Sequence, residues 1–223
     1  MFSPKGQKAL ALLALNTAVS ACGNDAVYRN AYQVLGNAFG DQPYPIERSA
    51  VDQSPYASIS AQINKNPKAF IVLATIEEKG NTWLAADYKS LITKRGRLLK
   101  TTGFDNNLAE LLMDGRFDDY FEEDRLNKPY ELGYTFMEPK PAVYALKCEM
   151  TKVGDETIEI LDRSYDLVKY AEKCKDPRFW YFTNEYWIDP SNHHVWKSKQ
   201  HFHPEYDPVD IEVLKAVNIN LQR

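Results

Sequence analysis

The 223-residue chain lacks several features that mark whole classes of proteins. It has no basic excess: 27 Lys and Arg stand against 31 Asp and Glu, for a net charge of −4, which argues against general nucleic-acid binding. Its longest apolar run, residues 9–15, would build a helix only ~10 Å long, against a hydrocarbon core of ~30 Å. We therefore predict no transmembrane helix. The remaining composition, 44% hydrophobic and 26% charged, is typical of a globular domain.

The chain also lacks the short motifs of common enzyme chemistries. It contains no Gly-x-Ser-x-Gly elbow, no glycine-rich phosphate loop and no His-Glu-x-x-His helix. Carboxylate pairs such as Asp118–Asp119 and Glu122–Glu123 are consecutive charges on a polar stretch. A glycosidase needs instead two carboxylates held ~5–10 Å apart across a cleft. We expect no enzymatic activity and no cofactor.

The first 21 residues have the pattern of a secretory signal. Lys5 and Lys8 precede the apolar run over 9–15, and small residues follow it. We predict that residues 1–21 are removed and that residues 22–223 form a single β-rich domain.

The residue at the predicted cleavage point is Cys22. The stretch Val19–Cys22 resembles a bacterial lipobox, in which the cysteine receives diacylglycerol before cleavage, so that acyl chains hold the protein on a lipid bilayer. The alternative is ordinary cleavage after Ala21, which leaves Cys22 as a plain thiol. Gly23, rather than an aspartate, follows the cysteine, and this favours the outer membrane of a Gram-negative bacterium, facing the periplasm.

The other two cysteines form an even pair once Cys22 is lipidated. An exported chain enters an oxidising compartment, so we predict a disulfide between Cys148 and Cys174. The alternative is two buried free thiols.

Most of the chain after residue 55 has the alternation and turn signals of β-structure. The pattern predicts a mainly β fold, with a large antiparallel meandering sheet that is either a half-open barrel or sandwich-like. It also predicts an N-terminal helix over 26–38, an extended connector without regular helix over 41–55, and an irregular surface excursion over 114–129. A short inserted helix should begin at Asp105 and run through Leu112. The predicted strands cover 56–63, 69–76, 82–86, 90–93, 98–101, 130–137, 142–151, 156–161, 164–173, 179–188, 195–202 and 209–221.

Several of these segments together resemble a known family. In their order, their spacing and their position behind a lipobox, they resemble the YjbF/GfcB family of lipoproteins, which is associated with exopolysaccharide and group 4 capsule production. The resemblance covers about residues 26–217. It implies a β-rich periplasmic domain tethered to the outer membrane and carries no catalytic residues. The segments are Pro55–Ile59, Phe70–Ala74, Trp83–Asp87, Gly96–Gly103, Tyr186–Pro190 and Trp196–Gln200.

A predicted hairpin tip is basic. Lys94, Arg95, Arg97 and Lys100 lie on it, and many capsular polymers are anionic, so these side chains are candidates to contact uronate or phosphate groups. The alternative is a solvated turn whose charges protect a sheet edge.

Two further clusters have simpler explanations. The histidines His193, His194, His201 and His203 fall within eleven residues, but no cysteine or paired carboxylate completes a metal set at familiar spacing, so we predict no metal. The aromatics between Phe179 and Trp196 can stack on sugars, yet alternate aromatics in a strand mostly fill the core.

The leading hypothesis is a non-enzymatic lipoprotein that supports assembly or export of an exopolysaccharide or capsule. It would engage the polymer or other proteins of the secretion system. The alternative is a carrier that binds a lipid or glycolipid in a concave sheet, and a polysaccharide hydrolase is third. A large apolar concavity would favour the carrier, facing carboxylates in a cleft would favour the hydrolase, and a flat polar surface would favour a scaffold.

Overall fold

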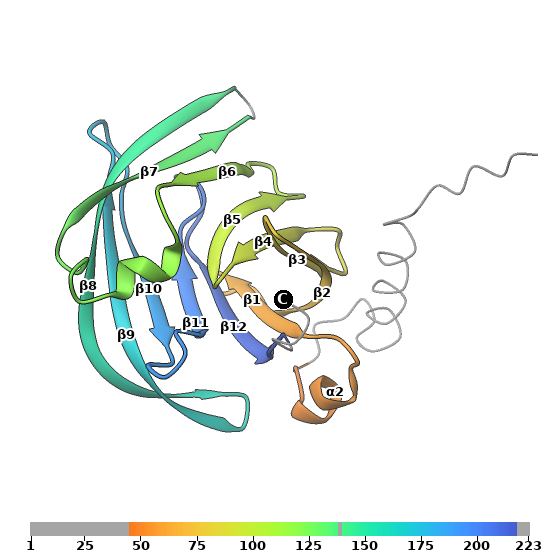
Figure 1. Cartoon of the computed structure of the whole chain (residues 1–223). Coiled ribbons are helices and arrows are strands. Elements are labelled where there is room, and N and C mark those ends of the chain that lie inside the picture. The colour runs from red at the N-terminus through yellow and green to blue at the C-terminus, as the bar shows by residue number, and fades with distance from the viewer. Residues whose placement is uncertain (1–44, 138–139, 218–223) are drawn as a thin grey trace, which may run out of the picture.

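The chain forms one antiparallel sheet of twelve strands, in a computed structural model that describes residues 45–137 and 140–217. The strand order is β5-β4-β3-β2-β1-β12-β11-β10-β9-β8-β7-β6. Figure 1 shows the sheet curling round until the two edge strands, β5 and β6, lie next to each other. This nearly closed sheet confirms the predicted mainly β, antiparallel meandering fold.

The strand bounds follow the predicted segments closely in most of the chain. They are β1 Ser58–Ile63, β2 Ala69–Glu77, β3 Gly80–Ala85, β4 Ser90–Lys94, β5 Arg97–Thr102, β6 Leu108–Met113, β7 Pro129–Phe136, β8 Ala142–Ile160, β9 Arg163–Lys175, β10 Tyr181–Ile188, β11 Val195–Gln200 and β12 Val209–Lys215.

The meander is interrupted at one place, where the last strand enters the middle of the sheet. β12 pairs with β1 on one side and with β11 on the other, so the two ends of the described chain meet. This placement agrees with the prediction that the segment from Val209 onward joins the sheet. At the seam, the Leu108 amide donates a hydrogen bond to Thr101 Oγ1 (2.9 Å). A side chain thus bridges β6 and β5 at one end.

The inside of the curled sheet is filled by alternate side chains of nearly every strand. One buried cluster joins residues of opposite walls, such as Ile59, Trp83, Leu146 and Phe202. Most of the aromatics predicted to fill the core are buried, whereas Phe179 and Tyr181 are 60% and 66% exposed.

The longest hairpin, β8–β9, corrects one prediction. We expected separate strands over 142–151 and 156–161, but β8 is continuous, because a bulge between Lys152 and Gly154 bends the strand instead of ending it. Gly154 has φ +150, a conformation that glycine adopts freely.

The tip of this hairpin is held by a helix in the segment that we expected to be only extended. α2 (Arg48–Gln53) fits between Pro45 and Pro55, so that prediction was wrong for these six residues. Arg48 donates from Nε to Asp162 (2.8 Å) and from Nη1 to the carbonyl oxygen of Leu214 (2.8 Å). The helix thereby ties the β8–β9 turn to β12.

The predicted inserted helix from Asp105 is wrong, because Leu108–Met113 form strand β6. Leu108 and Leu111 are three residues apart, which is a helical spacing. A register shift against β7 between Leu108 and Glu110 lets both enter the core, at 1% and 6% exposure. A bulge therefore produced the pattern that we interpreted as helix.

The segment over 114–129 is also less irregular than predicted. It contains the 3₁₀ helix η1 (Phe117–Phe121), whose Phe117, Tyr120 and Phe121 are all buried. These rings pack against Tyr186 and Met150 inside the sheet. Glu122, Glu123 and Asp124, which follow directly, are exposed. The acidic character of the segment therefore hid its buried aromatic residues from sequence reasoning.

The predicted signal segment 1–21, Cys22 and the helix over 26–38 lie outside the described residues. Within residues 45–137 and 140–217, no helix combines the length and the apolar character needed to cross a membrane.

Candidate functional site

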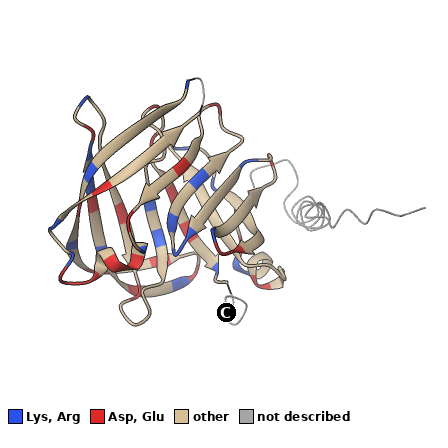
Figure 2. Cartoon of the chain, turned by 45° about the horizontal axis from the view of Figure 1, so that its top comes forward, with Lys and Arg blue, Asp and Glu red and all other residues tan. Residues whose placement is uncertain are grey.

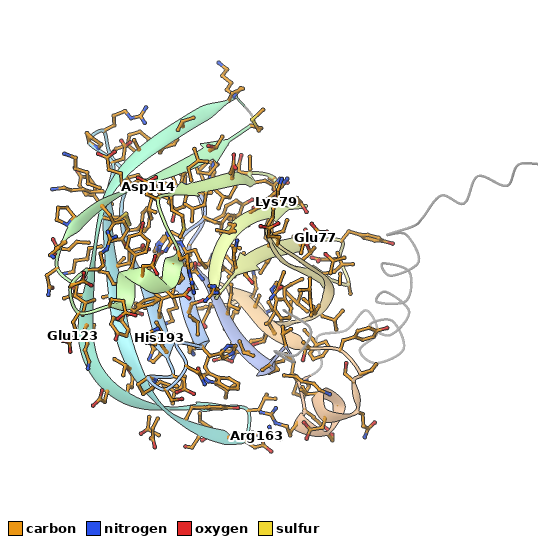
Figure 3. The ribbon with its side chains drawn as sticks, viewed as in Figure 1. Glu77, Lys79, Asp114, Glu123, Arg163 and His193 are labelled. Atoms are coloured by element: carbon orange, nitrogen blue, oxygen red, sulfur yellow. A yellow bond between two sulfur atoms is a disulfide. The ribbon has the colours of Figure 1, made fainter. Side chains whose placement is uncertain are left out.

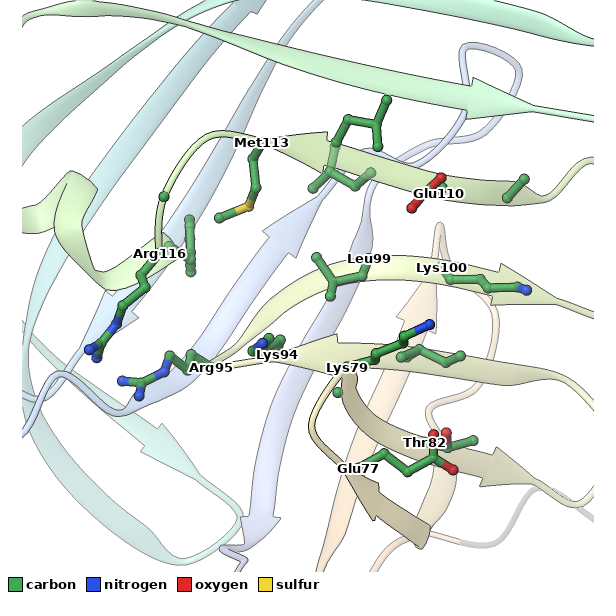
Figure 4. A pocket seen from close by; sticks show the side chains of 17 residues that line it. Glu77, Lys79, Thr82, Lys94, Arg95, Leu99, Lys100, Glu110, Met113 and Arg116 are labelled. Atoms are coloured by element: carbon green, nitrogen blue, oxygen red, sulfur yellow. The ribbon is translucent and has the colours of Figure 1, made fainter. Parts of the chain in front are cut away.

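A groove of about 750 Å³ lies over the seam between β5 and β6, and we call it the seam groove. It is lined by the β2–β3 turn, the β4–β5 hairpin, and β6 with the turn that follows it. Figure 4 shows Leu99 and Met113 at the gap between the two edge strands. Leu112 of β6 also lines the groove and is 47% exposed. The seam thus offers an apolar floor that solvent reaches.

Charged side chains surround this floor, five of them basic and two acidic. The acidic residues are Glu77 and Glu110. The basic ones are Lys79, Lys94, Arg95, Lys100 and Arg116.

The basic residues of the seam groove fall into two groups. Arg95 and Arg116 both form ion pairs with Asp118, Arg116 at 2.9 Å, so the two arginines share one carboxylate. Lys79, Lys94 and Lys100 make no ion pair with any carboxylate of the described chain, and we call them the seam lysines. Charges of both signs cover the rest of the molecule (Figure 2). The groove differs in combining uncompensated lysines with an apolar floor.

The β4–β5 turn explains how the sequence places this basic tip. Arg95 and Gly96 have φ values of +51° and +83°, which is the two-residue hairpin geometry that favours glycine at its second position. A Cβ at Gly96 would lie 2.4 Å from the Val195 Cβ, so only glycine fits against β11.

Sequence reasoning found Lys94, Arg95 and Lys100 but missed Lys79. Figure 3 places Lys79 beside Glu77 at the β2–β3 turn. The sequence predicts the β2–β3 turn, but it does not show which strands lie beside the basic β4–β5 hairpin. β3 pairs with β4, and this pairing puts the β2–β3 turn beside the basic hairpin.

Arg97, the fourth candidate, does not belong to the exposed tip. It is 1% exposed and points inside the sheet, where its guanidinium forms an ion pair with Glu172 of β9. The prediction that Arg97 contacts a polymer is therefore wrong. The turn ends at Gly96, and the next residue already faces the interior.

A buried polar network surrounds this ion pair. Arg97 donates to the hydroxyl groups of Tyr186 and Tyr134 (3.2 Å for Tyr134), and Tyr130 donates to Glu172 Oε1 (2.6 Å). Asn184 Nδ2 donates to Glu172 Oε2 (2.7 Å). The network therefore links β5 to the opposite wall through the interior.

Burial and neighbouring charges shift the pKa values of four groups in this network away from their ordinary values. Burial alone would lower the pKa of Arg97, but the Glu172 carboxylate and the neighbouring tyrosines raise it well above its ordinary value. Burial raises the pKa of Tyr134 to about 12 and also raises the pKa of Tyr130 and Tyr186. Arg97 is thus a fixed cation and the tyrosines are neutral donors, which is suited to holding the sheet together.

The structure joins Cys148 of β8 to Cys174 of β9 by a disulfide. The two residues are directly paired across the strands and both are buried. Glu172 lies close to both sulfur atoms, but the sulfurs are bonded to each other. These three side chains are therefore not arranged as free metal ligands.

The four histidines make separate contacts. His193 lies in the β10–β11 turn (Figure 3), where its Nδ1 is 4.0 Å from Glu122 Oε1. The ring of His194 packs edge-on against Trp196. The ring of His201 lies 4.8 Å from that of Phe182, and that of His203 lies 4.7 Å from that of Phe136. Burial lowers the pKa of His194, His201 and His203, so these imidazoles are neutral at pH 7.

A second concavity, which we call the interior cavity, occupies about 510 Å³ beside the β10–β11 turn. Ile59, Trp83, Ile211 and Val213 form apolar walls, and these residues lie far apart in the sequence. Sequence reasoning missed this cavity, because no local pattern shows that side chains of β1, β3 and β12 line the same cavity.

Comparison with known proteins identifies the family. The profile of a family described as group 4 capsule polysaccharide lipoprotein GfcB, YjbF matches residues 16–214. The chain belongs to this family. It is 30% identical to the lipoprotein YjbF of Escherichia coli K12 over 199 residues (82% of this chain and 88% of the relative), and 26% identical to GfcB of the same strain over 196 residues (79% and 84%). The resemblance seen in the sequence is thus confirmed.

The YjbF family fold is shared with a solved structure. The crystal structure of the lipoprotein YmcC from Escherichia coli K12 aligns with a TM-score of 0.71, covering 86% of this chain and 96% of that chain at 22% identity. This likeness concerns the fold alone. Membership of the family links the chain to lipoproteins and to group 4 capsule polysaccharide.

Proposed function

We propose that this protein is a lipoprotein anchored through Cys22 to the outer membrane, facing the periplasm, and that it supports assembly or export of a capsule polysaccharide without catalysing a reaction. The family description, the lipobox-like stretch before Cys22 and the basic seam groove support this proposal. In this proposal the seam groove contacts an acidic polymer directly.

The observation that carries the polymer contact is the set of three seam lysines beside an apolar floor. A uronic acid offers the matching groups, because its carboxylate attracts ammonium groups and its ring has apolar C–H faces. Lys79, Lys94 and Lys100 have no carboxylate partner in the described chain, so binding an anion breaks no existing ion pair there. An open groove also suits a polymer that must pass along the site.

The tether makes a prediction for living cells. In a strain that lacks this gene, the wild type should restore surface and secreted polysaccharide, and Cys22→Ser should not, because without acyl chains the protein is not held at the membrane. Polysaccharide is measured in both complemented strains, with protein abundance checked by immunoblot. Equal restoration by Cys22→Ser would make the anchor dispensable, and unchanged polymer in the deletion strain would refute the capsule function.

The seam groove makes a separate prediction for the purified protein. Changing all three seam lysines to Glu should weaken binding to polygalacturonate at low salt by at least about tenfold, which corresponds to ~1.4 kcal/mol. Wild-type binding should also weaken as salt rises, because the attraction is between exposed charges. Binding is measured by calorimetry, with neutral dextran as the comparison polymer.

The matched control changes three exposed lysines on the outer face of β8 and β9. Lys147, Lys173 and Lys175 are exposed and do not line the seam groove, and changing them to Glu alters the net charge equally. This variant should keep most of the affinity. An equal loss in both variants would mean that net charge, not the groove, attracts the polymer.

A further inference from the structure

The interior cavity is a separate concavity that the polymer hypothesis leaves unused. Its apolar side is built by Ile59 of β1, Trp83 of β3, and Ile211 and Val213 of β12, the strand that pairs with β1. Ile59, Trp83 and Ile211 are themselves buried in the main core cluster. The space is therefore a recess in the hydrophobic interior, within the ~300–1,000 Å³ typical of ligand sites.

The polar side of the cavity contains two buried atoms without hydrogen-bond partners. Arg95 and Arg116 both bind Asp118 Oδ2, which leaves Asp118 Oδ1 buried and unpaired. His194 Nε2 is also buried and unpaired. Both residues line the cavity. Because buried polar atoms are nearly always hydrogen-bonded, two unpaired ones in the wall of one cavity indicate where a ligand supplies partners.

The chemistry of these two atoms restricts the ligand. Asp118 Oδ1 is a carboxylate oxygen that only accepts hydrogen bonds, so the ligand must bring a donor there. Arg95 and Lys197 also line the cavity, so its net charge does not select the head group. A carboxylate head group brings only acceptors and leaves Asp118 Oδ1 unpaired, whereas a hydroxyl group can donate to Asp118 and either donate to or accept from the neutral His194. The apolar walls suit a hydrocarbon chain.

We propose that the interior cavity binds a single-chain amphiphile with an uncharged, hydroxyl-bearing head group. The hydrocarbon chain packs between Trp83 and Ile211, and the head-group hydroxyls pair with Asp118 Oδ1 and His194 Nε2. The proposal goes beyond the polymer contact, since the seam groove and the interior cavity share only Arg95 at their border.

The probe is octyl β-D-glucopyranoside, titrated below its micelle concentration into the full mature protein and followed by calorimetry. One molecule should bind per chain. Octanoate has the same chain length with an anionic head, and glucose has the head alone, so both should bind at least tenfold more weakly. No saturable binding of the glucoside, or equal binding of octanoate or glucose, would overturn the proposal.

Two variants test the site and one controls for the substitution. Val213→Trp fills the cavity and should abolish binding, whereas Val153→Trp, at a site on β8 that is 60% exposed, should leave it unchanged. Asp118→Asn keeps the size of the side chain. In this variant the ratio of the affinity for octyl glucoside to the affinity for octanoate should fall at least fivefold.

The variants also keep the two proposals apart. If Val213→Trp does not fold, as judged by thermal unfolding, the preference measured with Asp118→Asn decides the question. Undiminished binding of octyl glucoside by folded Val213→Trp, or an unchanged preference in Asp118→Asn, would refute the site. The seam-lysine variant should still bind octyl glucoside, and Val213→Trp should still bind polygalacturonate, so failure of one proposal is distinguishable from failure of the other.

Discussion

Replacing Arg97 by Met should lower the free energy of unfolding by about 3–5 kcal/mol, because it leaves the Glu172 carboxylate buried without its cation. Both side chains are 1% exposed, so water does not screen or replace the lost partner. The loss is measured by urea unfolding followed by far-ultraviolet circular dichroism. Arg116→Met, which removes an arginine from an exposed pair with Asp118, is the matched control and should change stability little.

The double variant Arg97→Met/Glu172→Gln separates the ion pair from the rest of the network. Once both charges are gone, no uncompensated ion remains buried, so the double variant should be more stable than Arg97→Met alone. The glutamine side chain of this variant keeps an oxygen that can accept a hydrogen bond of the kind that Tyr130 and Asn184 donate to Glu172. If the two single effects simply add, the guanidinium and the carboxylate are not coupled, and the proposed link across the interior is wrong.

Removing the disulfide should cost about 3.5 kcal/mol of unfolding free energy, as expected in the chain-entropy treatment for cysteines 26 residues apart. The bond stabilises the fold chiefly by restricting the unfolded chain, so the Cys148→Ala/Cys174→Ala variant should unfold at lower urea with its native fold retained. The change is measured by denaturant unfolding at pH 7.

Reductant provides the control for this prediction. Dithiothreitol should lower the midpoint of the wild type towards that of the double-alanine variant and should leave the variant itself unchanged. A wild type that does not respond to reductant under unfolding conditions would show that the two cysteines are free thiols.

Much of the β-structure was predictable because its signals are local. Alternation of apolar and polar residues marks each strand, and turn residues such as Asn64 and Asp189 end them. The errors occurred where a bulge changes the alternation. In β6 the bulge places Leu108 and Leu111 on one face. In β8 the strand continues through the bulge at Gly154.

The candidate site was only partly predictable. A hairpin tip rich in basic residues is visible in the sequence, and Lys94, Arg95 and Lys100 do line the seam groove. Sequence reasoning placed Arg97 on the exposed tip, whereas its side chain faces the interior. Whether a side chain next to a turn faces inward or outward changes when the strand register shifts by one residue. The two-residue turn at Arg95 and Gly96 pairs Lys94 with Arg97, and Gly96 fits there only because it has no Cβ to collide with Val195 on a distant strand.

The sequence by itself determined the class of fold, the turns, the pairing of Cys148 with Cys174 as the even set, and the family resemblance. These depend on residue type, count and short spacing. Tertiary structure decided how the sheet closes, which brings β5 beside β6 and creates the seam groove. It also decided that Arg97 meets Glu172 and that Ile59, Trp83 and Ile211 surround one cavity. The physical reason is that closing a sheet joins residues that are distant in the chain, and no local pattern encodes which of them meet.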